Sequence, residues 1–177
     1  MYLRGHYCSP AYEEAPDGRS HYRNPPVKNK AVDKVRRAIG FPTSMPIEFE
    51  DFNHFQIQVP LAKWRKCNAI HNWIVQNCAD GEDKCQEIYL DTDTLETLAR
   101  CIEQIFLAPD AVRQSVAEEL IPTTSGFFFG DTSYDEWYYK DLKYTLKRIK
   151  LIIKYQEEQI AKKNGRPFDN IVYEASW

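Results

Sequence analysis

Leucine and isoleucine recur at steps of three or four residues in the middle of the chain. This stripe runs from Leu95 to Phe106, and such spacing places all its members on one face of a helix. Asp93 stands just ahead of the stripe, and Glu96 three residues later would complete a capping box with it. The pattern therefore predicts a helix that begins near Asp93, and a further helix is expected over residues 110–120.

The longest helix is expected near the end of the chain. Leucines and isoleucines between residues 142 and 160 again keep helical spacing. Ser133 and Glu136 form a capping box ahead of them, so the helix is predicted over residues 133–163. A shorter helix is predicted over residues 29–39.

Alternation of polar and apolar residues predicts the extended segments. Apolar side chains alternate with glutamines over residues 55–59, the period-two pattern of a half-buried strand. Pro60 is expected to stop this strand and to start a helix over residues 61–77. Tyr89 and Leu90 are expected to lie in a short extended stretch.

These elements predict a mainly α protein of the α+β type. It would be a compact helical domain with one long C-terminal helix and a small β element, made of residues 54–59 and the Gly126–Gly130 region. Residues 1–177 are expected to form a single domain. Within it, residues 1–28 would be an irregular N-terminal arm or flap, because prolines punctuate them, and residues 29–177 the helical core.

Composition and charge narrow the possible functions. The chain has 177 residues, 43% of them hydrophobic and 28% charged, which is the composition of a globular protein with a real core. The net charge of −3 argues against general nucleic-acid binding. No apolar run approaches the ~18 residues of a membrane span, and no signal peptide is visible, so the expected location is cytoplasmic. The five cysteines contain no CxxC pair, so a zinc ribbon is not expected. No metal and no cofactor are predicted.

The stretch WRKCNAIHNW, residues 64–73, is the first candidate for function. On a helix that begins at residue 61, Trp64, Asn68 and His71 would share one edge of the apolar face. There an unpaired amide or imidazole would cost about 1–3 kcal/mol, so each needs a partner, either a protein group or a ligand. Trp64 could stack on a nucleobase, Asn68 could hydrogen bond to its edge, and Arg65 could bind a phosphate.

The second candidate is TTSGFFFGDTSYDEWYY, residues 123–139. Its hydroxyls and glycines would allow close approach of a ligand just before a helix N-terminus, although its acidic residues oppose a phosphate there. Tyr134, Tyr138 and Asp141 would line a polar edge of the long helix. The candidate ligand-binding residues of both motifs are Trp64, Arg65, Asn68, His71, Thr124, Ser125, Gly126, Phe127, Tyr134, Asp135 and Tyr138.

The same two motifs resemble a widespread family of small bacteriophage and prophage proteins. Many members carry W-R-K-x-N-x-I-H-x-W and later S-G-F-F-F-G with Y-D-x-x-Y, and the resemblance covers about residues 55–150. The family is largely without an assigned activity. The resemblance implies a viral origin, hence the cytoplasm of an infected bacterial cell, and small accessory phage proteins commonly counter host defence.

Three functions are compatible with these features. The first is a phage accessory protein that binds and sequesters a small nucleotide-derived signalling ligand without turnover. The second is an inhibitor that binds a host defence protein directly. The third is a nucleotide hydrolase or transferase with His71 as general base and Asp135 or Glu136 as acid. Association into a homo-oligomer and the absence of membrane binding are further expectations.

Overall fold

The computed structural model describes residues 1–8, 12–14, 20–22, 34, 38, 56–126 and 131–175. The chain divides into two compact units, one formed by Met1–His6 with Gln58–Trp177 and the other by Tyr7–Ile57. In the second unit, β2 (Tyr12–Glu14) and β3 (Ser20–Tyr22) pair antiparallel.

A four-stranded sheet with the order β4-β1-β6-β5 organises the larger unit. Its strands are β1 (Tyr2–Cys8), β4 (Gln56–Lys63), β5 (Ile88–Leu90) and β6 (Asn170–Glu174). Both β1 and β5 pair antiparallel with β6, and Tyr2 lies opposite Glu174 at one end of the β1–β6 ladder. Three consecutive residues of β6, Ile171 to Tyr173, are buried, so this interior strand is covered on both faces.

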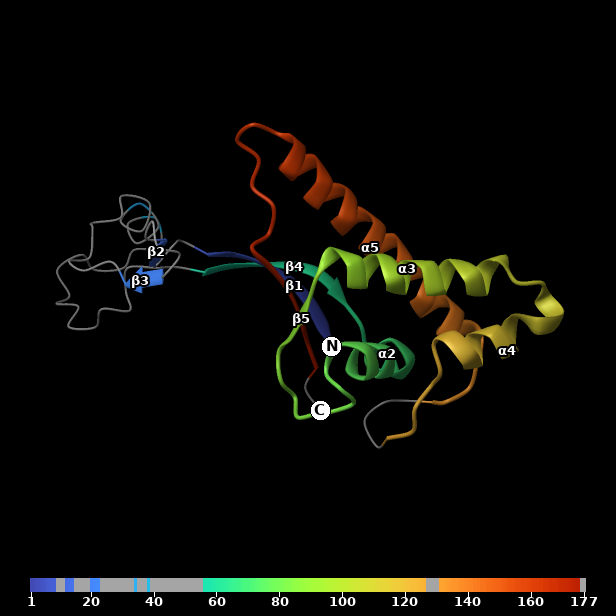
Figure 1. The fold of residues 1–177 in the computed structure, drawn as a ribbon. Coiled ribbons are helices and arrows are strands. Elements are labelled where there is room, and N and C mark those ends of the chain that lie inside the picture. The colour runs from blue at the N-terminus through green and yellow to red at the C-terminus, as the bar shows by residue number, and fades with distance from the viewer. Residues whose placement is uncertain are drawn as a thin grey trace. The chain divides into compact units, whose positions relative to one another are not determined.

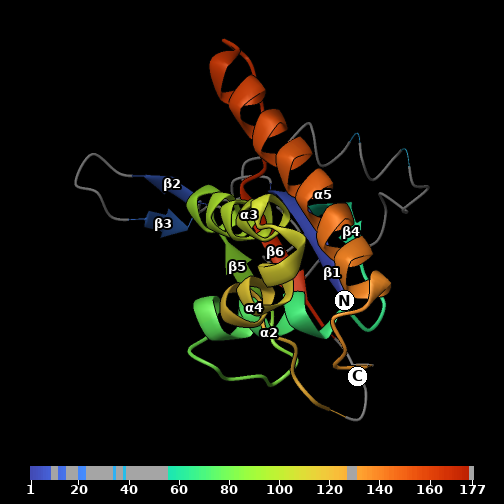
Figure 2. The ribbon, with the colours of Figure 1, turned by 90° about the vertical axis from the view of Figure 1, so that its right-hand side faces the viewer.

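The described helices are α2 (Asn68–Cys78), α3 (Thr92–Leu107), α4 (Asp110–Leu120) and α5 (Glu136–Ala161). Helix α3 packs against both α5 and α4. Figures 1 and 2 show α3 and α5 together on one side of the sheet, with the C-terminal half of α5 extending beyond it. Ile102 and Ile105 of α3 and Leu142 and Ile149 of α5 are completely or almost completely buried. None of the described helices is long and apolar enough to cross a membrane.

The sheet is larger than the small β element that the sequence predicts. Strand β1 lies in the segment that was expected to be irregular, and β6 follows the long helix without a predicted counterpart. Residues 123–126 form no strand, and Phe127 to Gly130 lie outside the described residues. The pairing of β1 with β6 joins segments more than 160 residues apart, so no local pattern announces it. Position 5 of β1 requires a glycine, because a Cβ there would lie only 2.5 Å from the Phe168 ring.

The start of α2 is the correction that matters most for function. Strand β4 does not stop at Pro60 but continues to Lys63, which is possible because an edge strand tolerates a proline. The helix predicted from residue 61 begins only at Asn68. Trp64 and Arg65 therefore lie in the loop before α2 and do not share a helical edge with His71.

The other helices agree with the sequence over most of their length. Helix α4 has the predicted bounds, and β5 covers the predicted extended stretch. The N-caps differ, since Asp91 rather than Asp93 caps α3 and Asp135 rather than Ser133 caps α5. Of the helix predicted over residues 29–39, only Lys34 and Ala38 are described, and both are helical.

The buried face of α5 is shifted relative to the predicted stripe. Ile160, expected to be buried, is 71% exposed. The residues that the structure buries are Tyr138, Leu142, Thr145, Ile149, Ile152 and Gln156. Thr145 and Gln156 are polar, so a prediction based on the spacing of apolar residues does not include them.

Candidate functional site

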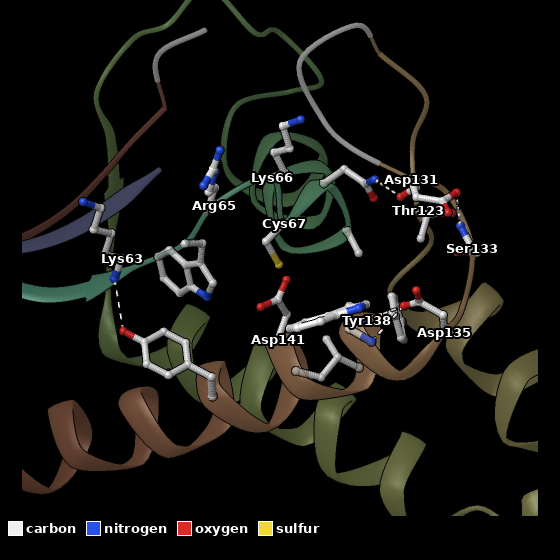
Figure 3. Close-up of a pocket in the computed structure, with 16 residues that line it drawn as sticks. Lys63, Arg65, Lys66, Cys67, Thr123, Asp131, Ser133, Asp135, Tyr138 and Asp141 are labelled. Atoms are coloured by element: carbon white, nitrogen blue, oxygen red, sulfur yellow. Dashed lines mark hydrogen bonds between the residues drawn. The ribbon is translucent and has the colours of Figure 1, made fainter.

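A solvent-open cavity of about 610 Å³ lies between the loop that joins β4 to α2 and the first turns of α5 (Figure 3). Its size is in the range of small-molecule binding sites, about 300–1,000 Å³. Both sequence motifs contribute to its walls. Five of the predicted ligand-binding residues line it, namely Trp64, Arg65, Asn68, Asp135 and Tyr138.

The end of β4 and the loop that follows it supply the positive charge of the cavity. Lys63, Arg65 and Lys66 all line the cavity. Figure 3 shows Arg65 and Lys66 at its rim, on the side of the loop away from Asp141. Both are exposed, and no ion pair joins either of them to a carboxylate among the described residues. Their charge is therefore available to an anionic ligand.

Lys66 has a backbone conformation that is unusual for a residue with a side chain. Its φ is 58°, in the left-handed region, which costs about 1–2 kcal/mol for a residue other than glycine. The Asn68 N–H donates to the Lys66 carbonyl at 3.1 Å and closes the turn. This turn ends β4 and begins α2, and it brings the two cationic residues to the cavity.

Asp141 and Cys67 lie at the opposite side of the cavity, close to each other (Figure 3). Burial raises the pKa of the Asp141 carboxyl, a hydrogen bond from the Cys67 thiol lowers it, and the negative charge of Asp135 raises it. Burial also raises the pKa of Cys67 well above its usual value, and the Asp141 charge adds to this effect. The thiol therefore stays protonated at neutral pH, and a protonated thiol is a poor nucleophile.

The remaining acidic lining residues already serve the backbone. The Asp135 carboxylate accepts from the N–H groups of Trp137 and Tyr138 at 2.9 and 3.0 Å and so caps α5. The Asp131 carboxylate accepts from the Ser133 N–H at 3.1 Å, and hydrogen bonding from the Ser133 side chain and then from its backbone lowers the pKa of Asp131. No group of three or more histidine, cysteine, aspartate or glutamate side chains within the described part of the chain could hold a metal ion.

Two tryptophans line the cavity in different ways. Trp64 is 5% exposed, and its Nε1–H donates to Thr145 Oγ1 at 2.8 Å, so it forms a fixed part of the wall. Trp137 is 70% exposed, and the Lys140 ammonium lies 4.4 Å from the centre of its ring. Trp137, rather than Trp64 as predicted from the sequence, therefore has an exposed aromatic surface on which a ligand could stack. Tyr144 also lines the cavity, and its hydroxyl accepts from the Lys63 N–H at 3.2 Å.

Asn68 joins the two sequence motifs. Its Nδ2–H donates to the Asp131 carbonyl at 2.7 Å, and its Oδ1 accepts from the Thr124 N–H at 3.4 Å. The amide thus holds both sides of the segment that contains the two glycines. Asn68 lines the cavity, and these two hydrogen bonds connect it to the protein backbone on both sides of that segment.

His71 does not line the cavity, contrary to the prediction. It is 3% exposed, with Nδ1 2.8 Å from the Tyr173 hydroxyl and Nε2 2.7 Å from Asp83 Oδ2. Burial raises the pKa of Tyr173, so its hydroxyl keeps its proton. The imidazole ties α2 to β6 and to the loop after α2, and this position does not suit a general base acting in the cavity.

The other predicted residues lie beside the cavity or outside the described chain. Thr124, Ser125 and Gly126 are not among its lining residues. The Tyr134 hydroxyl accepts from the Thr123 N–H at 3.1 Å, within the protein. Phe127 lies outside the described residues.

Several lining residues were missed, most clearly Lys63, Lys66, Cys67 and Trp137, and Asp141 was predicted on the polar edge of the long helix but not among the ligand-binding residues. The spacing of Trp137 and Asp141 contained a signal, because residues four apart on a helix share a face. Lys66 and Cys67 gave none, because they were placed on a helix that starts later than predicted.

Fold and cavity together define an α+β protein with an antiparallel sheet and a cavity lined by charged and aromatic side chains at the start of two helices, α2 and α5. No protein-family model, curated protein or solved structure matches the chain. The likeness to bacteriophage proteins rests on the two sequence motifs and stays a prediction.

Proposed function

We propose that the protein binds a small nucleotide-like ligand in this cavity and holds it without turnover. The observation that carries the proposal is the largely exposed Trp137 indole on the wall of a cavity whose rim carries Arg65 and Lys66. An aromatic face and cations around one cavity match the planar base and the phosphate of a nucleotide.

The phosphate end of the ligand is best placed near the start of α2. Arg65 and Lys66 stand there without carboxylate partners among the described residues, and the first turn of α2 contains no acidic side chain. The positive end of the helix dipole adds to the attraction of an anion. The first turn of α5 suits a phosphate less well, because Asp135 and Glu136 stand there.

Retention rather than turnover is favoured by the chemistry of the lining residues. Cys67, the thiol among the lining residues, is kept protonated by its raised pKa. His71, the candidate general base, is enclosed between Tyr173 and Asp83 away from the cavity. We therefore rank sequestration above hydrolysis or transfer.

The biological role that fits this proposal is sequestration of a nucleotide-derived signal by a phage protein in an infected cell. This part rests on the sequence resemblance. Direct inhibition of a host protein remains the alternative, and a stoichiometric host protein recovered with the tagged chain in place of a small molecule would favour it.

Calorimetric titration tests the binding step. The probes are AMP, GMP, cyclic di-AMP and ADP-ribose, each titrated at low salt. At least one should bind with a Kd below 100 μM, about 5.5 kcal/mol or more of binding free energy. Its binding should weaken about tenfold in Arg65→Ala and in 0.5 M NaCl, because the Arg65–phosphate contact is exposed to salt. Arg100→Ala, an exposed arginine of α3 that does not line the cavity, is the matched control and should bind as the wild type does.

The fate of the bound probe separates a sponge from an enzyme. The complex is incubated for an hour and denatured by heat, and the released nucleotide is analysed by chromatography. Full recovery of the unchanged nucleotide is expected. More than one equivalent of product per protein chain would replace sequestration by catalysis, and no binding by any of the four probes would overturn the proposed function.

The stacking step has its own readout in tryptophan fluorescence. Among the tryptophans that the structure describes, Trp64 and Trp73 are buried and Trp137 is exposed, so a ligand that stacks on Trp137 should quench the emission of Trp137. Trp137→Phe should abolish the quenching and keep most of the affinity, since a phenyl ring still stacks. Trp137→Ala should lose about tenfold in affinity, given about 1–3 kcal/mol for stacking a base on an aromatic ring.

A further inference from the structure

Asp141 is the lining carboxylate that the protein leaves most available. Asp135 and Asp131 use their carboxylates on backbone N–H groups. Asp141 is half-buried and lies close to the Cys67 thiol, and no ion pair joins it to a cation among the described residues. A carboxylate has about four acceptor positions, and the one thiol beside it can use only one of them.

The surroundings of Asp141 favour a donor from the ligand. In Figure 3 its carboxylate rises from α5 toward Cys67 and the open part of the cavity. Of the three lining cations, Arg65 and Lys66 lie at the rim on the far side of the loop, and the Lys63 ammonium lies 5.3 Å from the centre of the Tyr2 ring. A half-buried carboxylate without a cationic partner gains most from a hydrogen-bond donor that enters with the ligand.

We infer that Asp141 is a specificity-determining residue that accepts a hydrogen bond from an exocyclic amino group of the bound base. This inference rests on the proposed function and names the ligand class more closely, as a nucleotide of an amino-bearing base such as adenine or guanine. Arg65 and Lys66 then hold the phosphate, Trp137 contacts the plane of the base, and Asp141 reads its amino group.

Two pairs of nucleotides test the inference, because the members of each pair differ by one amino group. AMP is compared with purine riboside 5′-monophosphate, which lacks the 6-amino group, and GMP with IMP, which lacks the 2-amino group. Titrations at pH 8 keep the phosphates fully charged. In at least one pair the amino-bearing member should bind about ten times more tightly, the size expected for a hydrogen bond to a charged group.

Substitution of Asp141 should change this ratio in steps. Asp141→Asn keeps a weaker, neutral acceptor and should reduce the ratio to about threefold. Asp141→Leu removes the acceptors at similar size and should bring the ratio close to one. Glu136→Gln is the control, because it removes a negative charge from the same helix at an exposed residue that does not line the cavity, and it should leave the ratio unchanged.

Each outcome has a distinct meaning. A wild-type ratio near one in both pairs, with binding intact, overturns the role of Asp141 and leaves the proposed function standing. A tenfold ratio that persists in Asp141→Leu assigns the discrimination to another residue and also overturns the inference. If none of the four nucleotides binds, and cyclic di-AMP and ADP-ribose also fail, the proposed function falls and the inference falls with it.

Discussion

Asn68 and His71 lie one turn apart on α2 and are equally buried, yet their surroundings differ. Asn68 faces the segment of the second motif at the edge of an open cavity. His71 lies between Tyr173 and Asp83, inside the protein. Both side chains meet the requirement that a buried polar group be hydrogen-bonded. The comparison teaches that a polar residue on an apolar helix face marks an organised contact, and that only the neighbouring segments decide whether a cavity adjoins it.

The largest expected effect comes from breaking the enclosed contact. His71→Ala removes a buried ring and both of its contacts with Tyr173 and Asp83, and should lower the free energy of unfolding by about 3 kcal/mol. Urea denaturation measures the loss as a lower midpoint. Nucleotide affinity of the folded protein should stay within twofold of the wild type, because His71 does not line the cavity. A selective loss of affinity with unchanged stability would move His71 back into the binding site.

The pattern of polar and apolar residues within a segment was sufficient to predict those helices and strands whose buried face is set by that segment alone. Helix α4 and strand β5 were placed correctly, and α3 was placed to within a residue or two. The sheet could not be predicted in the same way. The residues of β1 and β6 become a sheet only because they pair with each other across almost the full length of the chain, and that pairing leaves no periodic signal in either segment.

The candidate site was likewise predicted only in part, because it also depends on contacts between segments that lie far apart in the sequence. The two motifs do meet, and Asn68 is the contact between them. The detailed prediction for this site depends on a helix that starts at residue 61, directly after Pro60. Since Pro60 lies within edge strand β4, Trp64 lies in the loop before α2 and is buried, and Trp137 is the exposed tryptophan among the lining residues.

Substitution of Asn68 and of Asn72 tests whether the position of Asn68 beside the cavity matters for ligand binding. Asn68→Ala loses two bonds to the second motif and should lower the free energy of unfolding by about 2 kcal/mol. Asn72 makes a single bond of the same kind, from Nδ2 to the Pro122 carbonyl at 3.3 Å, and Asn72→Ala should cost about 1 kcal/mol or less. Only Asn68→Ala should also weaken AMP or GMP binding, because only Asn68 lines the cavity. Equal losses of affinity in both variants would show that Asn68 has no special place in the site.

A smaller effect on ligand binding is expected from two residues that flank α2. Lys66 before the helix and Asp80 after it both have left-handed backbone conformations, with φ values of 58° and 51°. Glycine relieves the strain at either position but has more freedom in the unfolded chain, so Lys66→Gly and Asp80→Gly should each change stability by no more than about 1 kcal/mol. Their effects on nucleotide binding should differ. Lys66→Gly removes a cation from the rim and should weaken binding severalfold, whereas Asp80→Gly should leave it unchanged. Calorimetry on both variants checks this, and equal affinities would remove Lys66 from the binding residues.

The smallest effect concerns pH and two aspartates whose pKa values shift in opposite directions. Burial raises the pKa of Asp141 in the folded chain above its ordinary value of 3.8. At pH values between 3.8 and this higher folded pKa, the folded chain binds more protons than the unfolded chain. The contribution of Asp141 to stability therefore falls as pH rises through this range. Hydrogen bonds from Thr94 lower the pKa of Asp91 below 3.8, so its contribution is present above pH 3.8 and is lost as pH falls through the lower, folded value.

Removing each charge should therefore change the pH dependence of stability with opposite sign. Asp141→Asn should gain stability relative to the wild type as pH rises from 4 to 7. Asp91→Asn, whose amide still caps α3, should lose its relative stability over the acidic end of the range, as pH rises from 2 to 4. Urea midpoints measured at several pH values give both curves. Parallel curves for Asp141→Asn and the wild type would mean that this carboxyl titrates as it does in water, and would count against a half-buried acceptor in the cavity.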